Sequence, residues 1–462
     1  MLIFKFGGTS VGNADRFGAV ADIVERARGR GLVVVLSAIA GTTSALIAGA
    51  RAAAEGSAAG YRAVKEELLG RHLIVVEQLL GAGTDRSAVR DYVIDRLDEY
   101  ERLCHSIATL GELTLRGNDA VASLGEELST RILAALLRAR GTPAEAVSST
   151  AVLRTDSQFG SAQPDMGETR RLASLHVRPL VAKGIVSVVT GHVGADARGV
   201  TTTLGRGGSD YSAAILGAAL DAEEVWMWTD VNGILTADPR LVPEARTLAQ
   251  LSYQEAEELA YYGASVLHPK TVSPLAARGI PLRITNSMQP DHPGTLIVSQ
   301  PEADRERLPA IISTQGLSLV GVIGQGEGWS LQVASRALHA LAEAGLDVLM
   351  FSQSFSERGL HLVMHREEQA HAIRILEKEF ANELALGILA RIGAHEEVAT
   401  VSVVGMPNGD EAPTARAYAA LGSLGVRVVS IAQAASAYSV SFVIPERDVA
   451  RTVAFLHRQL GL

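Results

Sequence analysis

Two glycine-rich segments carry the residues whose types and spacing could do chemistry, and the first lies near the N-terminus. It reads Lys5-Phe6-Gly7-Gly8-Thr9-Ser10 and stands between an apolar run and a segment of helical periodicity. Glycines let a backbone approach an anion closely, N–H groups at a helix start attract phosphate, and Lys5 adds a positive charge. The segment lacks the Gly-Lys-Ser/Thr ending of a Walker A loop and the third glycine of a dinucleotide fingerprint. It is therefore either an anion-binding loop or an ordinary glycine turn.

The second segment is Leu204-Gly205-Arg206-Gly207-Gly208-Ser209-Asp210, which precedes another helical pattern. The guanidinium of Arg206 could bind a carboxylate through two parallel hydrogen bonds. Asp210 could also be a plain helix cap, which is a common role for aspartate. Two such loops in one chain favour a ligand-binding interpretation over a purely structural one.

Two further segments stand where strands end and helices begin. Thr229-Asp230-Val231-Asn232-Gly233 directly follows a predicted strand, and Asp238-Pro239-Arg240 comes shortly after it. Ligands of open α/β sheets lie beyond the carboxyl ends of the strands, although a single Asp-x-x-Gly is often only a turn. Gly125-Glu126-Glu127 begins a helical pattern, where a glutamate usually complements the helix dipole.

The elements that must position these loops alternate along the chain. Apolar runs predict strands at 2–6, 32–36, 185–190, 224–229 and 280–285, and periodicity predicts helices from about 15, over 126–138 and over 212–220. Ser252 and Glu255 match a capping box before a further helix through Tyr262. This alternation predicts an α/β domain over 1–299 with a mostly parallel sheet.

The remainder of the chain, after a polar stretch at 301–307, contains an internal repeat. Arg336-Ala337, Leu341, Gly345, Val348, Gln353, Ser356 and Leu362 recur about eighty positions later as Arg416-Ala417, Leu421, Gly425, Val428, Gln433, Ser436 and Phe442. Each copy reads strand, helix, glycine turn, strand, strand, with the glycine suited to ending the helix. The repeat predicts two ferredoxin-like α+β domains, at 316–390 and 398–462, and strand 306–315 could join the second.

Composition sets the broad class. The chain has 462 residues, which at roughly 150 residues per domain corresponds to about three domains. With 47% hydrophobic and 20% charged residues it is typical of a globular enzyme, and its net charge of −9 argues against a nucleic-acid partner. Cys104 is the single cysteine, so no disulfide can form within the chain. We find neither a signal peptide nor a membrane span, and we expect a cytoplasmic protein.

Taken together, these motifs resemble those of the aspartate kinases, members of the amino acid kinase superfamily that carry two C-terminal ACT domains. The resemblance rests on KFGGTSV at 5–11, LSA at 36–38, Gly125-Glu126, TTTLGRGGSDY at 201–211, WTDVNG at 228–233, Asp238-Pro239-Arg240 and VLHP at 266–269. The motifs occur in the family's order, and the repeat is similar to its paired ACT domains. The resemblance implies an amino acid kinase fold with a mostly parallel central sheet, followed by two ferredoxin-like ACT domains.

The activity that the resemblance implies is transfer of the ATP γ-phosphoryl group to the β-carboxylate of L-aspartate. The products would be 4-phospho-L-aspartate and ADP, at the first step of the pathway to lysine, threonine and methionine. A carboxylate is already ionised at neutral pH and needs no general base, so catalysis should rest on positioning and charge neutralisation. Mg²⁺ should arrive as Mg·ATP, held largely by phosphates, and we expect no metal site made by the protein alone.

The roles of individual residues follow from the same resemblance. Lys5, Gly7, Gly8 and Asp210 would be catalytic, with Lys5 and the glycine N–H groups neutralising the transferred phosphoryl group and Asp210 organising Lys5. Ser37, Thr43, Glu126, Arg206 and Ser209 would bind aspartate, Arg206 holding its α-carboxylate and Glu126 its ammonium. The nucleotide side would comprise Thr229, Asp230, Leu235, Arg240 and Ser265.

Two positions on the nucleotide side depart from the family pattern. Ser265 stands where the family often has lysine, and Leu235 stands where tyrosine is common. These changes could weaken ATP binding, alter the nucleotide preference or be compensated by Lys270. They leave open an amino-acid sensor with an impaired kinase domain, and a kinase for another acidic amino acid is the enzymatic alternative. Because the residues around Lys5 and Glu126 are intact, we favour an active enzyme.

The repeat is most similar to the ACT domains of threonine-sensitive aspartate kinases, in which glutamines take part in effector binding. Gln353 and Gln433 match that pattern, although both could be polar residues at strand-edge turns. We expect feedback by threonine, with lysine as the alternative. The second copy has lost polar residues at Ala434, Ala435 and Ala437, so its site could be silent. The chain ends at Leu462 without room for a fused homoserine dehydrogenase, and we expect a monofunctional homodimer or homotetramer.

Overall fold

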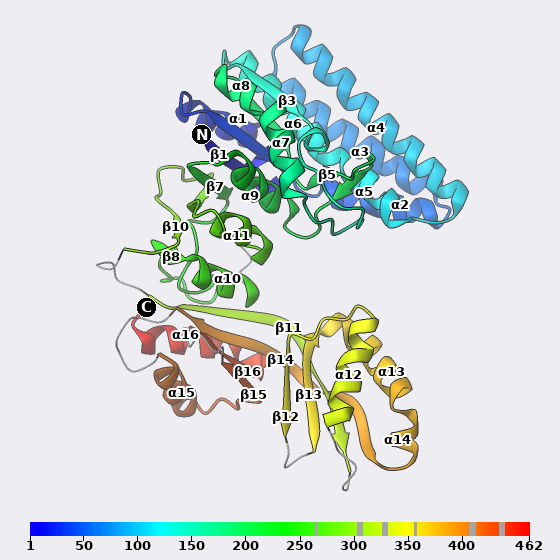
Figure 1. Cartoon of the computed structure of the whole chain (residues 1–462), viewed down its shortest axis with the longest axis vertical. Helices are drawn as coiled ribbons and strands as arrows, with labels where there is room; N and C mark the ends of the chain where they lie inside the picture. Colours follow the sequence, from blue (N-terminus) through cyan, green and yellow to red (C-terminus); the bar gives the residue numbers. More distant parts are fainter. Residues whose placement is uncertain (264–266, 303–307, 326–330, 355–357, 406–412, 434–438) are drawn as a thin grey trace. The chain divides into compact units, whose positions relative to one another are not determined.

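The structure is a computed structural model that describes residues 1–263, 267–302, 308–325, 331–354, 358–405, 413–433 and 439–462. The chain divides into two compact units. The first unit comprises Met1–Ile234, Thr247–Tyr261 and Ser265–Arg305, and the second comprises Leu235–Arg246, Tyr262–Ala264 and Glu306–Leu462. Figure 1 shows the elements of both units in chain order.

A largely parallel sheet forms the centre of the first unit. Its strands are β1 (Leu2–Phe6), β2 (Leu32–Leu36), β3 (Ala144–Val147), β4 (Val186–Thr190), β7 (Glu224–Thr229), β8 (Gln250–Ser252), β9 (Leu282–Asn286) and β10 (Thr295–Val298). They lie in the order β3-β4-β2-β1-β7-β9-β10-β8. Every neighbouring pair is parallel except β9 and β10. The predicted α/β class with a mostly parallel sheet is confirmed.

The middle strands bring the carboxyl ends of several elements to one edge. In register, Phe6 lies beside Leu36 on one side and beside Trp228 on the other. All five residues of β2 and of β4 are buried, because helices cover both faces of the sheet. The segments that follow β1, β2 and β7 therefore begin at the same level.

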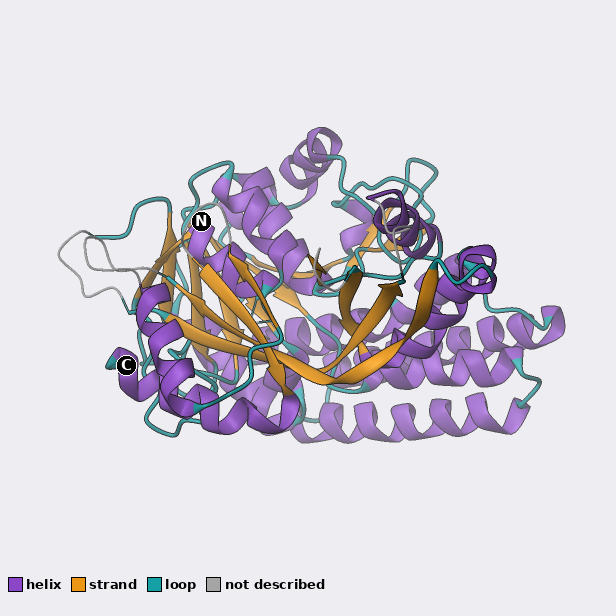
Figure 2. Cartoon of the chain, turned by 90° about the horizontal axis from the view of Figure 1, so that it is seen from below, coloured by secondary structure: helices purple, strands orange, loops and turns teal. Residues whose placement is uncertain are grey.

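Helices cover this sheet on both sides, and a small β-hairpin completes the unit. The helices are η1 (Gly8–Val11), α1 (Ala14–Arg26), α2 (Thr42–Ala54), α3 (Ala58–Leu79), α4 (Thr84–Leu110), α5 (Leu115–Ala122), α6 (Leu124–Ala139), η2 (Ser149–Ala151), α7 (Met166–His176), α8 (Arg178–Ala182), α9 (Gly208–Leu220), α10 (Tyr253–Tyr261) and α11 (Pro269–Ala276). The hairpin pairs β5 (Val193–Ala195) with β6 (Thr201–Thr203). The long helices α3 and α4, which the sequence analysis does not predict, run side by side (Figures 1 and 2).

The structure confirms the capping box predicted before α10 but places the start of α9 earlier than predicted. The capping box before α10 is confirmed, since the Ser252 N–H donates to Glu255 at 2.7 Å and the Glu255 N–H donates to the Ser252 hydroxyl at 3.2 Å. The helix predicted from 212 begins earlier, at Gly208, and Gly207 occupies its cap position with a φ of 70°. Asp210 therefore lies within the first turn, and the plain-cap alternative for it is wrong.

The second unit contains both copies of the repeat on one antiparallel sheet. Its strands are β11 (Ala310–Gly324), β12 (Met350–Ser354), β13 (Gly359–His365), β14 (Leu389–Val404), β15 (Ser430–Gln433) and β16 (Ser439–Pro445), in the order β12-β13-β11-β14-β16-β15. Its helices are α12 (Leu331–Glu343), η4 (Arg366–Glu368), α13 (Gln369–Glu379), α14 (Ala381–Ala385), α15 (Pro413–Leu424), η5 (Glu446–Asp448) and α16 (Val449–Leu460). Gly345 and Gly425 follow α12 and α15 with φ values of 70° and 66°, as their helix-ending role requires.

The two long central strands connect the copies. The first residues of β11, 310–314, pair with residues 400–404 of β14, and Ile311 packs in the core with α15 and α16. The later part of β11 belongs to the core that contains α12 and α13. One strand thus serves both copies, although the domain boundaries that we expect stay a prediction.

In the described part of the chain, no helix is long and apolar enough to cross a membrane.

Candidate active site

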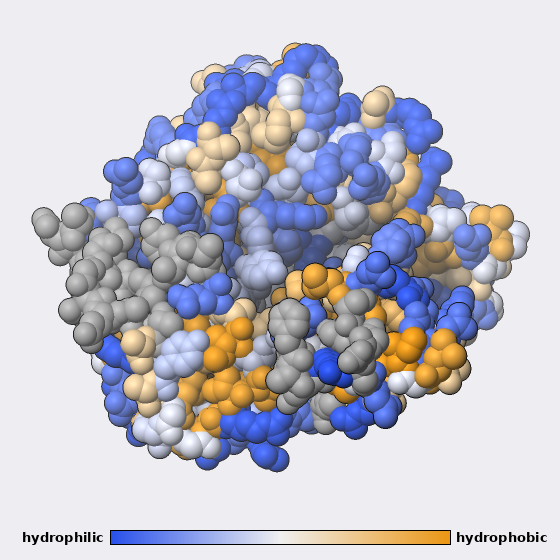
Figure 3. Space-filling view, turned by 60° about the horizontal axis from the view of Figure 1, so that its bottom comes forward, coloured by the Kyte–Doolittle hydropathy of each residue, from blue (hydrophilic) through white to orange (hydrophobic). Residues whose placement is uncertain are grey.

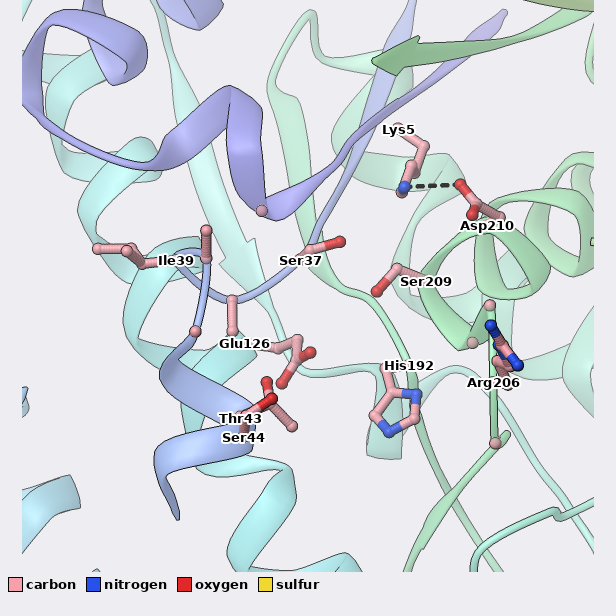
Figure 4. A pocket seen from close by; sticks show the side chains of 17 residues that line it. Lys5, Ser37, Ile39, Thr43, Ser44, Glu126, His192, Arg206, Ser209 and Asp210 are labelled. Carbon is pink, nitrogen blue, oxygen red and sulfur yellow. Dashed lines mark ion pairs between the residues drawn. The ribbon is translucent and has the colours of Figure 1, made fainter. Parts of the chain in front are cut away.

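A cavity of about 400 Å³ opens in the first unit at the carboxyl ends of β1 and β2. Both glycine-rich segments contribute to its walls, together with the start of α2 and the start of α6. Of the residues expected to be catalytic or to bind the amino acid, Lys5, Gly8, Ser37, Thr43, Glu126, Arg206, Ser209 and Asp210 line it (Figure 4). The fold therefore brings into one place residues that are far apart in the sequence.

Lys5 and Asp210 form the charged centre of the cavity. The Lys5 Nζ lies 2.6 Å from an Asp210 carboxylate oxygen, and the two side chains are 12% and 22% exposed. Lys5 reaches the cavity from β1, whereas Asp210 projects from the first turn of α9 (Figure 4). The ion pair fixes the direction of the ammonium while leaving the group accessible from the cavity.

The glycines of both loops allow close approaches that a side chain would prevent. A Cβ on Gly8 would lie 2.8 Å from the Ala38 carbonyl oxygen, so the first loop packs directly against the segment after β2. Gly205 and Gly207 have φ values of 79° and 70°, a conformation that favours glycine. Gly7 does not line the cavity but caps η1 in an extended conformation.

Glu126 supplies a buried carboxyl to the wall of the cavity. It stands in the first turn of α6 and is 4% exposed, and its Oε2 atom has no hydrogen-bond partner among the described residues. Burial raises the pKa of this carboxyl to about 8. A buried acid with an unsatisfied oxygen is suited to receive a positively charged group of a ligand. Arg206, in contrast, is exposed on its loop.

Two residues that the sequence analysis missed support these groups. Asp119, fully buried in α5, accepts hydrogen bonds from the N–H and hydroxyl of Thr203 at 2.9 and 2.7 Å, just before the second glycine loop. His192 lines the cavity and lies two residues after the end of β4. Its place after a predicted strand is the one sequence signal that could have identified it, because such positions often bind ligands.

The residues expected to bind the nucleotide do not form a single cluster among the residues that the structure describes. Thr229 and Asp230 end β7 and follow it in the first unit, with the Thr229 hydroxyl 3.2 Å from the Asp230 carboxylate. Leu235 and Arg240 belong to the second unit, where Arg240 is ion-paired with Asp238 at 2.6 Å. Ser265 lies outside the described residues. The nucleotide assignments stay a prediction.

The two glutamines expected to bind an effector occupy matching positions in the second unit. Gln353 lies on β12 and Gln433 ends β15, and these are the two edge strands of the sheet. The Gln353 Nε2 atom is buried without a hydrogen-bond partner among the described residues, whereas Gln433 is exposed. Ser356 and Ala434, Ala435 and Ala437 lie outside the described residues.

Comparison with known families gives matches for both the N-terminal and the C-terminal part of the chain. Residues 1–286 match the amino acid kinase family, and residues 320–380 and 401–460 each match the ACT domain. Aspartokinase 1 of Arabidopsis thaliana is 31% identical over 99% of this chain and 79% of its own length. The chain belongs to the aspartokinase family. The expected amino acid kinase fold with paired ACT domains is thereby confirmed.

Other aspartokinases extend the similarity over the whole chain. The bifunctional aspartokinase/homoserine dehydrogenase of Haemophilus influenzae is 32% identical over 100% of this chain and 56% of its own length. The chain thus spans about half the length of the bifunctional relatives that it matches. The crystal structure of Escherichia coli aspartokinase III in complex with aspartate and ADP superposes with a TM-score of 0.82, at 29% identity and full coverage of both chains.

Proposed function

We propose that this chain transfers the γ-phosphoryl group of ATP to the β-carboxylate of L-aspartate, giving 4-phospho-L-aspartate and ADP. The observation that carries the proposal is the cavity in which the Lys5–Asp210 ion pair, at 2.6 Å, faces the buried Glu126 and the Arg206 loop. A relative of known structure, E. coli aspartokinase III, was crystallised with aspartate and ADP.

The chemistry of the cavity suits an anionic nucleophile. The β-carboxylate is ionised at neutral pH, so no proton has to be removed before it attacks. The barrier arises from repulsion between the carboxylate and the phosphates, and the Lys5 ammonium is the group that would reduce it. The α-carboxylate would bind the Arg206 guanidinium, and the ammonium would bind Glu126. Magnesium would enter with ATP and be held largely by phosphate oxygens.

The test measures acyl-phosphate formation as hydroxamate, with Mg·ATP and a series of acidic amino acids. We expect L-aspartate to be the preferred acceptor, and Lys5→Ala to lower kcat by at least about 100-fold. Lys183→Ala, at an exposed lysine after α8, is the matched control and should keep the wild-type rate. A wild-type rate in Lys5→Ala would refute the catalytic assignment, and preference for another acidic amino acid would refute the substrate.

We further propose that the second unit binds an amino-acid effector, with threonine favoured and lysine as the alternative. The buried, unpartnered amide nitrogen of Gln353 supports a site that recognises polar groups of a small ligand. Lysine stays in the comparison because E. coli aspartokinase III was also crystallised with lysine and aspartate. Titrating each amino acid against the initial rate separates the two, and no effect of either would refute the effector site.

Self-association is the remaining part of the proposal. The edge strands β12 and β15 present large exposed side chains, Phe351 at 57% and Ile431 at 41% exposure. Apolar surface gathers in several patches on the face seen in Figure 3. Exposed edge strands with apolar side chains are suited to pairing with a second copy, so we expect a homodimer or homotetramer. Sedimentation analysis that finds only monomers at micromolar concentration would contradict this.

A further inference from the structure

His192 adopts a backbone conformation that its surroundings must impose. Its φ is 67°, and among the described residues only Asp221 and Arg358 are other non-glycine residues with positive φ. A left-handed conformation is unfavourable for a non-glycine residue, so it persists only where other contacts hold it in place. The position is also one that lines the active-site cavity.

The backbone of His192 is tied to both sides of the second glycine loop. Its N–H donates to the Ser212 hydroxyl at 2.9 Å, and its carbonyl accepts from the Leu204 N–H at 3.0 Å. Leu204 immediately precedes the loop, and Ser212 stands in α9 just after it. The backbone of His192 therefore holds the second glycine loop at both of its ends, at Leu204 and at Ser212.

The imidazole ring supports the loop from within. A Cβ on Gly208 would lie 2.1 Å from the His192 Nδ1 atom, so the ring takes the space of a side chain at 208. The Gly205 backbone also acts on the ring, opposing the effect of burial on the pKa of the imidazole. In Figure 4 the ring lies between Glu126 and Arg206. Arg206 itself stands between two left-handed glycines, Gly205 and Gly207, and such a segment needs outside support to hold one conformation.

We propose that His192 is a positioning residue for the amino-acid substrate, holding the glycine loop so that Arg206 can bind the substrate's α-carboxylate. The inference rests on the proposed function and deepens it, because it names the residue that sets the amino-acid site. Burial lowers the pKa of the imidazole, with the Asp119 carboxylate opposing this effect, so the ring acts as a neutral hydrogen-bonding group at pH 7.

The decisive variant is His192→Gly, which removes the ring and relieves the left-handed backbone. We expect KM for the amino acid to rise at least tenfold, while kcat and KM for ATP stay within about threefold and Tm is unchanged. His192→Asn, whose amide can still hydrogen-bond and which tolerates the left-handed conformation, should lose less. Asp221→Gly is the matched control, since it relieves the same conformation at the far end of α9 and should leave KM unchanged.

A double-variant comparison tests whether His192 acts through Arg206. If it does, adding His192→Gly to Arg206→Ala raises KM for the amino acid by less than twofold beyond Arg206→Ala alone. Additive effects, an unchanged KM in His192→Gly, or equal losses in kcat and in KM for ATP would each overturn the proposal. Assays of the wild type test the proposed function separately. If another acidic amino acid is the substrate, the aspartate assignment is wrong. The double-variant comparison is then made with that amino acid.

Discussion

Glu126 shows how a single buried carboxyl makes substrate binding depend on pH. It stands in the first turn of α6, in an ordinary helix-start sequence, yet burial raises its pKa to about 8. If it binds the substrate ammonium, as we propose, the carboxyl must lose its proton before or during binding. The loss of that proton becomes harder as the pH falls below the pKa.

We therefore predict that KM for L-aspartate rises about tenfold for each pH unit between pH 8 and pH 6. Glu126→Gln should raise KM and remove this pH dependence. Initial rates over pH 6–9 at saturating Mg·ATP measure both effects. A wild-type KM that is flat over this range contradicts the role given to Glu126.

The same pKa predicts a stability effect of defined sign. Because the folded-state pKa of Glu126 is above its ordinary value of 4.5, the folded state holds this proton more tightly than the unfolded state. Its contribution to stability is complete below about pH 4.5 and is lost as the pH rises through about 8. Relative to Glu126→Gln, the unliganded wild type should lose thermal stability between pH 5 and pH 9, and calorimetry that shows parallel curves would contradict this.

At the scale of elements, the second glycine loop depends on α5 as well as on its own strand and helix. Asp119 accepts three hydrogen bonds, two from Thr203 and one from the Gly160 N–H at 2.9 Å, and it is fully buried. The carboxylate thus joins α5, the hairpin strand β6 and the segment after η2. Removing it would leave the two buried donors of Thr203 and the part-buried N–H of Gly160 without this acceptor.

We predict that Asp119→Ala lowers the free energy of unfolding by about 3 kcal/mol. It should also lower kcat/KM for the amino acid, because the second glycine loop, which carries Arg206, loses the support of Asp119. Asp91→Ala, at an exposed position on α4, should change neither quantity measurably. Urea unfolding gives the first quantity and steady-state rates the second. Wild-type stability in Asp119→Ala would show that the three hydrogen bonds are replaced without cost.

A second element of interest is the segment Leu235–Arg246, which follows the predicted nucleotide motif but belongs to the second unit. Thr236 hydrogen-bonds to the buried His457 Nε2 at 3.0 Å, and its carbonyl accepts from the Ile311 N–H at 2.7 Å. Ala237 and Val242 pack in the core with α15 and α16. Both the hydrogen bonds and the apolar contacts therefore hold this segment to the ACT sheet and its helices.

We predict that Thr236→Val lowers the Tm by a few degrees, since His457 loses its partner in a buried position. Thr109→Val, at an exposed threonine on α4, is the matched control and should leave the Tm unchanged. A thermal scan measures both variants. An unchanged Tm in Thr236→Val would mean that this hydrogen bond does not anchor the segment.

At the scale of the whole molecule, the two ACT copies are related by sequence but differ in their candidate effector residues. Gln353 is half-buried and its amide nitrogen has no partner among the described residues, whereas Gln433 is exposed at the opposite edge of the sheet. A buried amide can contribute more to recognising a polar ligand than one already satisfied by water.

We therefore predict unequal effects of the two glutamines on feedback. Gln353→Ala should raise the effector concentration for half-inhibition at least tenfold, and Gln433→Ala should change it less than twofold. Both variants should keep the uninhibited rate. Inhibition curves with threonine and with lysine provide the measurement, and equal effects of the two substitutions would contradict the asymmetry.

The sequence by itself determined the class of the fold, the repeat and most of the cavity. Apolar strand runs and helical periodicity are local patterns, and the glycine loops indicate close backbone approaches through residue type alone. For this reason the amino-acid sequence was sufficient to single out Lys5, Arg206, Ser209 and Asp210, as well as the capping box at Ser252.

Only the tertiary structure decided the properties that depend on contacts between distant segments. These properties are the ion pair of Lys5 with Asp210 and the burial that raises the pKa of Glu126. They also include the contacts by which Asp119 and His192 support the second glycine loop. Each depends on residues that come from different elements. Local patterns do not encode such contacts, because burial and hydrogen-bond partners are set by packing. The same reason explains why Leu235–Arg246 could not be assigned to the second unit from its sequence.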